Sequence, residues 1–120
     1  MKKLRVAVLG TGAFAEACHV PGLQSHPGAE VVVLCGRNSA RTRAMADRLG
    51  VPEISLDYEQ VCARKDIDAI TIATPNVAHA LQAKAAFSAG KHVFCEKPLG
   101  MNVQEVIEMV RAAERSHAIH

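Results

Sequence analysis

Short apolar runs alternate along this chain with longer segments in which apolar residues recur every three or four positions. The runs, typical of strands buried on both faces of a sheet, are residues 4–9, 30–35, 51–55, 69–74 and 91–95. The helical segments are residues 13–25, 40–49, 57–63, 77–89 and a last one from Asn102 or Val103 to about Arg115. This alternation predicts an α/β fold, a doubly wound parallel sheet with right-handed crossovers.

Residue types at the segment ends mark where the helices begin and end. Ser39 is expected to be the N-cap of the helix over residues 40–49, with Gly50 just past its end. The last residues, 117–120, resemble the opening of one more strand. Because doubly wound folds commonly have six strands, we expect the chain to be part of a longer polypeptide. The alternative is a frayed tail without meaning.

Composition and charge exclude several classes of partner. The chain has 120 residues, enough for one domain, and 14 basic against 12 acidic residues give a net charge of +2. That charge is too small to indicate nucleic acid or membrane as a partner, and no apolar run approaches the ~20 residues of a membrane span. We therefore expect a cytoplasmic protein. Its cysteines, expected to be reduced, buried thiols without disulfide or metal roles, are Cys18, Cys35, Cys62 and Cys95.

The first apolar run leads directly into a Gly-x-Gly-x-x-Ala turn from Gly10 to Ala15, and a helical segment follows at once. This order is the dinucleotide-binding fingerprint in its required context. Gly10 permits a sharp turn, Gly12 lets a pyrophosphate approach the backbone, and Ala15 lets the helix pack closely on the strand. The helix then directs its free N–H groups at the phosphates. The alternative is a turn whose glycines serve packing alone.

The residues after the second predicted strand bear on the choice of cofactor. An NAD site usually has an Asp or Glu there to hold the ribose, but this strand runs into Gly36, Arg37 and Asn38, with Arg41 a turn further on. A guanidinium suits a 2′-phosphate because it offers a charged fork of donors. The pattern therefore favours NADP over NAD, with Arg37, Asn38 and Arg41 as candidate contacts. Arg37 stacked on adenine remains open, and Arg43 is expected on a solvated helix face.

Two further turns follow strands at the same expected edge of the sheet. Thr74, Pro75 and Asn76 follow one strand, with His79 in the first turn of the next helix. There Asn76 is equally a candidate helix cap, and a histidine at His79's position is more often a surface residue than a ligand contact. After the next strand, Lys97 beside Glu96 would place a cation where it stabilises negative charge on a substrate oxygen. A surface ion pair between the two is the structural alternative.

The chain resembles the glucose–fructose oxidoreductase / inositol dehydrogenase / rhizopine catabolism (Gfo/Idh/MocA) family over essentially its whole length. The motifs that carry the resemblance are Gly10-x-Gly12-x-x-Ala15, His19-x-Pro21, Thr74-Pro75-Asn76 with His79, and Gly90-Lys91-His92-Val93 followed by Cys95-Glu96-Lys97-Pro98. The resemblance implies a Rossmann domain followed by a C-terminal α/β domain, which oxidise a sugar, cyclitol or related hydroxyl reversibly with NAD or NADP. It also implies a cis Lys97–Pro98 bond, which members of the family often use.

Residue by residue, the resemblance implies that Lys97 is the catalytic lysine. The residues implied to surround the pyrophosphate are Gly10, Thr11, Gly12, Ala13 and Phe14. Those implied to line the cofactor groove are Thr74, Pro75, Asn76 and His79, with Glu96 next to the lysine. No metal is implied.

The chain departs from the family in length, since members have roughly two hundred further residues that supply proton transfer and most of the substrate pocket. We therefore interpret residues 1–120 as the cofactor domain of such an oxidoreductase, without its substrate domain. The full-length protein is expected to be a homo-oligomer acting on a small sugar or polyol, and this chain alone to be inert. A non-catalytic dinucleotide-binding sensor is the alternative, although it would have no use for Lys97. A methyltransferase is disfavoured by the absent carboxylate after the second strand.

Overall fold

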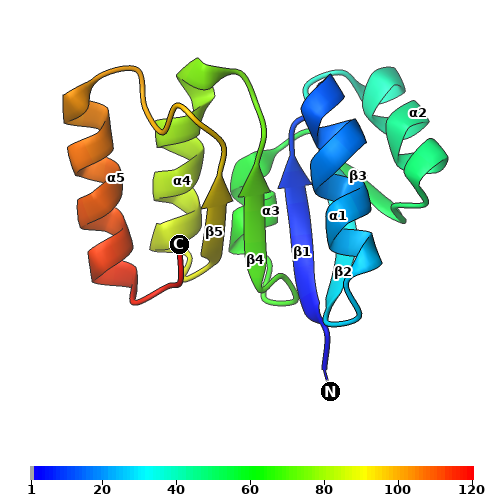
Figure 1. Ribbon diagram of the computed structural model, residues 1–120, viewed down its shortest axis with the longest axis horizontal. Coiled ribbons are helices and arrows are strands. Elements are labelled where there is room, and N and C mark those ends of the chain that lie inside the picture. Colours follow the sequence, from blue (N-terminus) through cyan, green and yellow to red (C-terminus); the bar gives the residue numbers. More distant parts are fainter. Residues whose placement is uncertain (1) are drawn as a thin grey trace.

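The computed structural model describes residues 2–120, in which strands and helices alternate as the pattern predicts (Figure 1). The elements are β1 (Leu4–Leu9), the π-helical turn η1 (Ala15–His19), α1 (Val20–Ser25), β2 (Ala29–Cys35), α2 (Ser39–Leu49), β3 (Glu53–Ser55), α3 (Tyr58–Ala63), β4 (Ala69–Ile72), the 3₁₀ turn η2 (Asn76–Ala78), α4 (His79–Ser88), β5 (His92–Cys95) and α5 (Val103–Ser116).

The five strands form one parallel sheet in the order β3-β2-β1-β4-β5, which confirms the predicted fold class. The chain winds outward from β1 to β3 and then crosses to β4 and β5 on the other side of β1. The strand order therefore reverses between β1 and β4. In sheets of this kind ligands bind outside the carboxyl ends of the strands at such a reversal.

The helices cover both faces of the sheet, so the central strands are buried on both faces. Ala7 and Leu9 of β1 belong to a core shared with α3, α4 and α5, whereas Val8 belongs to a second core with Ala15, α1 and α2. All three side chains are fully buried. This packing fixes the carboxyl ends of β1, β4 and β5 relative to one another, and those ends carry the candidate site.

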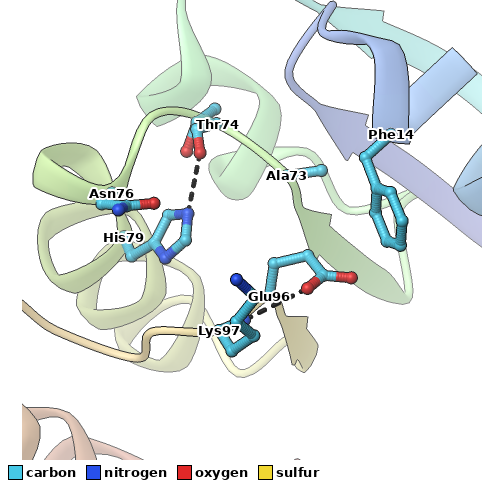
Figure 2. A pocket seen from close by; sticks show the side chains of 7 residues that line it. All are labelled: Phe14, Ala73, Thr74, Asn76, His79, Glu96 and Lys97. Carbon is cyan, nitrogen blue, oxygen red and sulfur yellow. Dashed lines mark hydrogen bonds between the residues drawn. The ribbon is translucent and has the colours of Figure 1, made fainter.

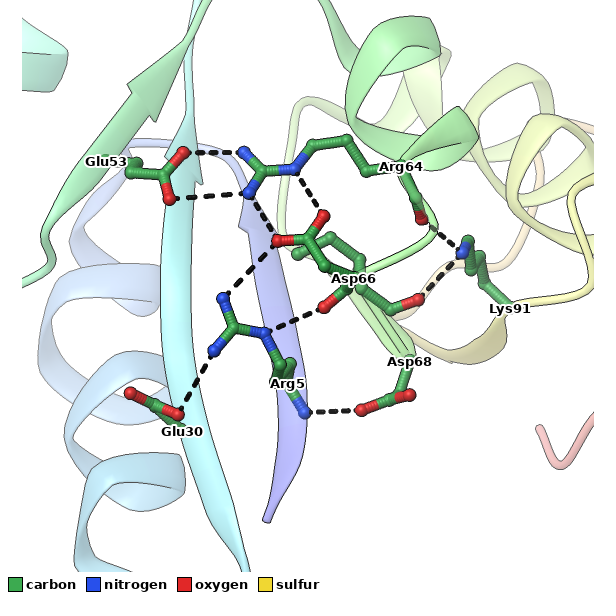
Figure 3. A network of polar contacts seen from close by, with 8 residues as sticks. Arg5, Glu30, Glu53, Arg64, Asp66, Asp68 and Lys91 are labelled. Atoms are coloured by element: carbon green, nitrogen blue, oxygen red, sulfur yellow. Dashed lines mark hydrogen bonds and ion pairs between the residues drawn. The ribbon is translucent and has the colours of Figure 1, made fainter. Parts of the chain in front are cut away.

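The opposite, amino-terminal edge of the sheet is held by a network of charged side chains (Figure 3). The Lys91 ammonium is buried and donates to the carbonyl oxygens of Arg64 at 2.6 Å and Ile67 at 2.7 Å. The Arg64 guanidinium binds Glu53 at 2.6 Å and Asp66 at 2.7 Å. Arg5 of β1 donates to the Asp66 carbonyl oxygen at 2.9 Å. The loop before β4 is thus tied to β1, β3 and the start of β5.

The helix ends and the first helix differ in detail from the prediction. Gly50 lies in the left-handed region at φ 67°, as expected of a residue that ends α2. Ser39 as the N-cap of α2 is wrong, because the Asn38 side chain accepts the Arg41 N–H at 2.9 Å and Ser39 is already helical. The helix predicted over residues 13–25 is present but contains the π-helical turn η1, for which the sequence has no signal.

Two expectations about particular residues also need correction. Cys18 is exposed and Cys95 is half-buried, whereas both were expected to be buried, although all four cysteines are free thiols. Residues 117–120 form no strand, but the Val93 N–H donates to the Ile119 carbonyl at 3.0 Å, so the end of the chain lies against β5. Within residues 2–120, no helix is both long and apolar enough to cross a lipid bilayer.

Candidate functional site

The turn after β1 brings the chain close to the end of β4. Gly10 has a φ of +119°, and a Cβ there would collide with the backbone carbonyl of Ala73. Its N–H donates to the Cys35 carbonyl at 2.8 Å, which joins the turn to the end of β2. Gly10 is therefore required by the fold itself, since a side chain would part β1 from β4.

Gly12 stands in contrast, because nothing lies within 4 Å of where its Cβ would be. The fold alone leaves this position open, at the start of a helix whose first turn has N–H groups without intrahelical acceptors. The Glu16 N–H donates to the Gly12 carbonyl at 3.1 Å, so the helix begins directly beyond this space. An open, backbone-lined space at a helix N-terminus fits a pyrophosphate, with Thr11, Ala13 and Phe14 around it.

The end of β2 has no room for an acidic side chain. A Cβ on Gly36 would collide with the Thr42 hydroxyl and lie 2.7 Å from the Thr11 methyl group. Thr42 is fully buried and its hydroxyl donates to the Asn38 carbonyl at 2.6 Å, so it has no freedom to move aside. With Thr42 and Thr11 in place, the first position after β2 therefore has no space for a carboxylate side chain.

The candidate contacts for the adenosine end differ in their surroundings. Arg41 extends from α2 to the glycine-rich turn and donates to the Thr11 carbonyl at 3.1 Å. Asn38 uses its side chain to cap α2. Arg37 is exposed, and no hydrogen bond or ion pair of its side chain occurs within residues 2–120. Arg43 was expected on a solvated helix face; it pairs with Asp47 at 3.0 Å, but it is half-buried and also donates to the Val51 carbonyl at 3.3 Å.

The turn after β4 carries two of the predicted residues in unexpected settings. Asn76 begins η2, and its side chain makes no capping hydrogen bond, so its interpretation as a helix cap is wrong. The expectation that His79 lies on the surface is wrong as well, since it is only 1 % exposed. Its ring nitrogens contact the carbonyl oxygens of Pro98 at 2.7 Å and Thr74 at 2.8 Å. The Thr74 hydroxyl donates to Gln82 Oε1 at 2.6 Å.

In the turn after β5, Glu96 and Lys97 have different roles. Glu96 accepts a hydrogen bond from His19 Nε2 at 2.8 Å, and its other oxygen accepts the Lys97 backbone N–H at 3.2 Å. The expected alternative of a Glu96–Lys97 ion pair is absent from the part of the chain that the structure describes. The Lys97 side chain is exposed, and its ammonium has no partner among residues 2–120. The bond to Pro98 is cis, as predicted.

These turns meet around one cavity of ≈ 310 Å³ at the carboxyl edge of the sheet (Figure 2). Its lining comes from the ends of three neighbouring strands and comprises Phe14, Ala73, Thr74, Asn76, His79, Glu96 and Lys97. Six of these seven were site predictions. The arginines after β2 and the glycines of the first turn are outside this set. The cavity therefore joins the predicted groove and the predicted lysine, while the arginines lie apart from it.

Sequence reasoning gave no site role to His19, although it forms part of a quoted motif. Its ring lies edge-on between Phe14 and Phe94, with ring centroids 5.4 Å and 5.5 Å away. With Glu96 it joins η1 to the loop that carries Lys97. The His19-x-Pro21 spacing was the available signal, but its partner is distant in the sequence.

The cysteine nearest the site is unsuited to nucleophilic chemistry. Burial raises the pKa of the Cys95 thiol to about 11, with the Glu96 carboxylate adding to the effect. A thiol with such a pKa is almost wholly protonated near neutral pH. The chemistry that the cavity offers is therefore that of a free ammonium and polar backbone, rather than of a thiolate.

Comparison with known proteins identifies the family to which the chain belongs. The family model of oxidoreductases with an NAD-binding Rossmann fold, Gfo/Idh/MocA, matches residues 4–120. D-xylose 1-dehydrogenase (NADP(+)) 2 of Haloferax volcanii is 37% identical over 82% of this chain and 30% of its own length.

Two solved structures share the fold at similar coverage. KijD10, a 3-ketoreductase from Actinomadura kijaniata in complex with NADP and TDP-benzene, superposes with a TM-score of 0.90 at 30% identity, over 98% of this chain and 36% of that one. Myo-inositol 2-dehydrogenase from Lactobacillus plantarum gives a TM-score of 0.87 at 34% identity, over 96% and 34%. The chain thus spans about a third of the length of the relatives that it matches. It belongs to the Gfo/Idh/MocA oxidoreductase family and corresponds to that family's NAD(P)-binding Rossmann domain.

Proposed function

We propose that this chain binds NADP(H) in preference to NAD(H), and that the protein to which it belongs transfers hydride between the nicotinamide and a hydroxyl-bearing carbon of a sugar or polyol. The observation that carries the proposal is the setting of Lys97. Its ammonium is exposed and unpartnered within residues 2–120, and it shares a cavity with Phe14 of the glycine-rich turn. Relatives named as a xylose dehydrogenase and an inositol dehydrogenase support the substrate class.

In this proposal the two glycines of the first turn have separate duties. Gly10 keeps β1 against β4, and the open space over Gly12 admits the pyrophosphate to the backbone N–H groups at the helix start. The residues assigned around the pyrophosphate are Gly10, Thr11, Gly12, Ala13 and Phe14. Those assigned to the groove wall are Thr74, Pro75, Asn76, His79 and Glu96. The ring nitrogens of His79 already contact backbone oxygens, so it shapes the wall rather than binding through them.

Lys97 is assigned the chemical role. Nicotinamide, when bound, accepts or gives up a hydride. The Lys97 ammonium donates a hydrogen bond to the substrate oxygen and stabilises the negative charge that grows on it as the hydride moves. Because no carboxylate among the described residues pairs with this ammonium, its charge is available to the substrate. Glu96, engaged by His19, holds the Lys97 backbone instead of neutralising the Lys97 side chain.

The preference for NADP rests on the residues directly after β2. No carboxylate is present to hold a ribose 2′-hydroxyl, and the Gly36 position has no space for one. Exposed Arg37 is free to pair with a 2′-phosphate, with Asn38 and Arg41 beside it. KijD10, which was solved with NADP, and the xylose dehydrogenase named for NADP(+) support this choice.

The remaining parts of the proposal concern the whole protein. We assign residues 1–120 to a cofactor domain that acts with a separate C-terminal substrate domain, in a homo-oligomer. The length of the relatives supports the second domain. The free cysteines support a reducing compartment, the cytoplasm. One wall of a cleft does not hold a substrate carbon against the nicotinamide and away from water, so this chain alone should be inert.

Calorimetric titration of the 120-residue chain tests the cofactor preference. NADPH is expected to bind at least about tenfold more tightly than NADH, because Arg37 adds charged hydrogen bonds to the 2′-phosphate. Arg37→Ala should weaken NADPH by about tenfold and leave NADH unchanged, whereas the control Arg43→Ala should alter neither. Tenfold tighter binding of NADH would reject the preference.

Turnover tests the reaction. The 120-residue chain, given either cofactor and a panel of polyols and sugars, should show no turnover. The full-length protein should act on at least one of them, and Lys97→Ala should lower its kcat by about 100-fold or more. Cofactor binding without any turnover by the full-length protein would favour the sensor. Turnover by the isolated chain that Lys97→Ala abolishes would reject the claim of inertness.

A further inference from the structure

His19 turns from the first helical segment toward the loop that carries Lys97. It is the last residue of η1, and its side chain is 10 % exposed. The ring lies between Phe14 and Phe94, at centroid distances of 5.4 Å and 5.5 Å. Its Nε2 lies 2.8 Å from Glu96 Oε1, the distance of a well-formed hydrogen bond. The ring is thus held by two aromatic neighbours and one polar contact.

The turn that carries His19 is itself firmly placed. Ala15 at its start and Val20 directly after it are fully buried in the core on that face of the sheet. The Val20 N–H donates to the Ala15 carbonyl, five residues back, as in a π-helical turn. Glu16 of the same turn pairs with Arg48 of α2 at 2.8 Å. His19 therefore extends from a rigid base, and π turns within helices frequently occur at functional sites.

The direction of the hydrogen bond between His19 and Glu96 follows from the carboxylate. A carboxylate accepts hydrogen bonds and has no proton to donate, so the His19 nitrogen is the donor. A neutral ring protonated on Nε2 and an imidazolium both supply this N–H. The contact is therefore independent of whether the ring carries a charge. The other oxygen of Glu96 accepts the Lys97 backbone N–H at 3.2 Å.

The Glu96 side chain is thereby turned away from a second possible partner. The Lys97 ammonium is the neighbouring cation, yet no ion pair joins the two within residues 2–120. Figure 2 shows the carboxylate bound to the Lys97 backbone instead. The Glu96 backbone is held as well, since its N–H donates to the Ile72 carbonyl of β4 at 3.0 Å. With that backbone fixed, rotation of the Glu96 side chain decides whether the ammonium stays free.

The position of His19 favours an indirect influence on the site. Glu96 and Lys97 line the cavity, whereas His19 is outside the set of residues that line it. The ring nitrogen that points toward the Lys97 loop already binds Glu96. The influence of His19 on Lys97 therefore passes through the Glu96 carboxylate.

We propose that His19 is a positioning residue that holds the Glu96 carboxylate on the Lys97 backbone and away from the Lys97 ammonium. Without the His19 N–H, the carboxylate is free to rotate toward the ammonium. The Lys97 backbone N–H then loses its acceptor, and the charge of the ammonium is neutralised by its neighbour. The consequence for hydride transfer rests on the proposed function of Lys97. The orientation of Glu96 is a property of the 120-residue chain and is measurable without turnover.

Nuclear magnetic resonance of the ¹⁵N-labelled 120-residue chain separates the N–H of His19 from its ring. His19→Phe keeps an aromatic ring but has no donor, so the Lys97 backbone N–H should exchange with water about tenfold faster than in wild type. His19→Gln keeps an N–H donor without the ring and should restore this rate to within about threefold of wild type. Glu16→Gln, a control on the same turn, removes the ion pair with Arg48 and should leave the rate unchanged.

Two results of this comparison would overturn the proposal. The first is a Lys97 N–H that exchanges at the wild-type rate in His19→Phe. The second is an equal acceleration in His19→Phe, His19→Gln and Glu16→Gln, which would show that any disturbance of η1 has the same effect.

A double substitution tests whether His19 acts through Glu96. Glu96→Ala removes the acceptor and should accelerate exchange of the Lys97 N–H at least as much as His19→Phe. Adding His19→Phe to Glu96→Ala should then change nothing further, because the two side chains act in series. Additive effects would overturn the proposal. If His19→Phe does not fold, the His19 ring N–H decides: it should exchange slowly in wild type and fast in Glu96→Ala, and equal rates in both would overturn the proposal.

Activity of the full-length protein then distinguishes the two proposals. His19→Phe should lower kcat about tenfold with the Kd for NADPH unchanged, and His19→Gln should recover most of the loss. Unchanged kcat in His19→Phe, in a protein that Lys97→Ala inactivates, would overturn the positioning role. If the Lys97 N–H responds to His19 as expected but Lys97→Ala leaves turnover intact, the proposed function fails while the inference about His19 stands.

Discussion

The two edges of the sheet carry similar residue types but use them in opposite ways. At the amino-terminal edge, the buried Lys91 ammonium donates to two carbonyl oxygens, and Arg64 binds two carboxylates (Figure 3). At the carboxyl edge, the Lys97 ammonium (Figure 2) has no partner within the described residues 2–120, and neither has the Arg37 guanidinium.

Each polar group that a fold leaves unpaired is available to a ligand, and each one that it pairs contributes to the fold. Lys91 and Lys97 are six positions apart, just before the start and just past the end of the same strand, β5. Their chemistry is the same, and their surroundings alone assign one to structure and the other to the candidate site. The carboxyl edge also has paired side chains, and among them His79 and Glu96 hold the backbone around Lys97.

The largest effect is expected from a pair of glycine substitutions. Gly10→Ala should cost about 3 kcal/mol or more in the free energy of unfolding, because it adds a positive-φ strain to a collision with the Ala73 carbonyl. Gly12→Ala should change that free energy by less than about 0.5 kcal/mol, yet weaken NADPH binding at least about tenfold. Urea unfolding and calorimetry measure the two. Unaltered NADPH binding in Gly12→Ala would show that the open space has another purpose.

The two lysines offer the next largest contrast. Lys91→Met should lower the free energy of unfolding by about 2 kcal/mol, because two carbonyls lose their donor in a buried setting. Lys97→Met should leave it within about 0.5 kcal/mol of wild type. Denaturant midpoints of the 120-residue chain check both values. If both variants lose the same free energy of unfolding, the two lysines do not differ in their contribution to the fold, and the proposed contrast between the two edges of the sheet is wrong.

The smallest effect concerns acid. The hydrogen bond from Arg64 holds the pKa values of Asp66 and Glu53 below their usual ranges. A carboxylate with a lowered folded-state pKa stabilises the fold above its unfolded pKa, near 4, and this contribution is lost as the pH falls toward the folded value. Thermal unfolding should therefore show a loss of stability below about pH 4 that Asp66→Asn reduces.

Asp47→Asn is the control for acid, since Asp47 makes one exposed pair with Arg43 on α2. This variant should follow the wild-type pH dependence. High salt should reduce the difference between Asp66→Asn and wild type, because these side chains are partly exposed and their attraction is screened. If stability depends on pH in the same way in Asp66→Asn and wild type, the network does not contribute to the loss of stability in acid.

The fold followed from the sequence because its determinants are local. Unbroken apolar runs predict doubly buried strands, and Gly50 and Asn102 lie at helix ends for reasons of backbone geometry and capping. Ser39 was predicted as the N-cap of α2, but Asn38 has the extended backbone angles and the capping hydrogen bond, and Ser39 is the first helical residue. The π-helical turn depends on how η1 packs rather than on any single residue, so no local signal revealed it.

The residues that line the cavity were largely among those predicted, but their hydrogen-bond partners were not. Six of the seven residues around the cavity were expected from strand-end motifs. The partners were not, because His79 bonds to Pro98 across 19 positions and Glu96 to His19 across 77. An ion pair between Glu96 and its neighbour Lys97 was the structural alternative, yet the fold supplies Glu96 with a partner from η1, His19. Side-chain partners depend on which loops the sheet brings together, and that is known only from the structure.

The crowding at Gly36 limits which substitutions could change the cofactor preference proposed for this chain. A switch toward NAD is commonly imagined as the gain of one acid after β2, but here the first position is closed by Thr42 and Thr11. An acid there would require prior loss of bulk at Thr42, a buried residue whose hydroxyl also secures the start of α2. An acid could be introduced without such a collision at exposed Arg37 and, after it, at its neighbour Asn38. Under the proposed preference for NADP, a single substitution to an acid collides with Thr42 at Gly36, whereas the exposed position of Arg37 next to it is open to one.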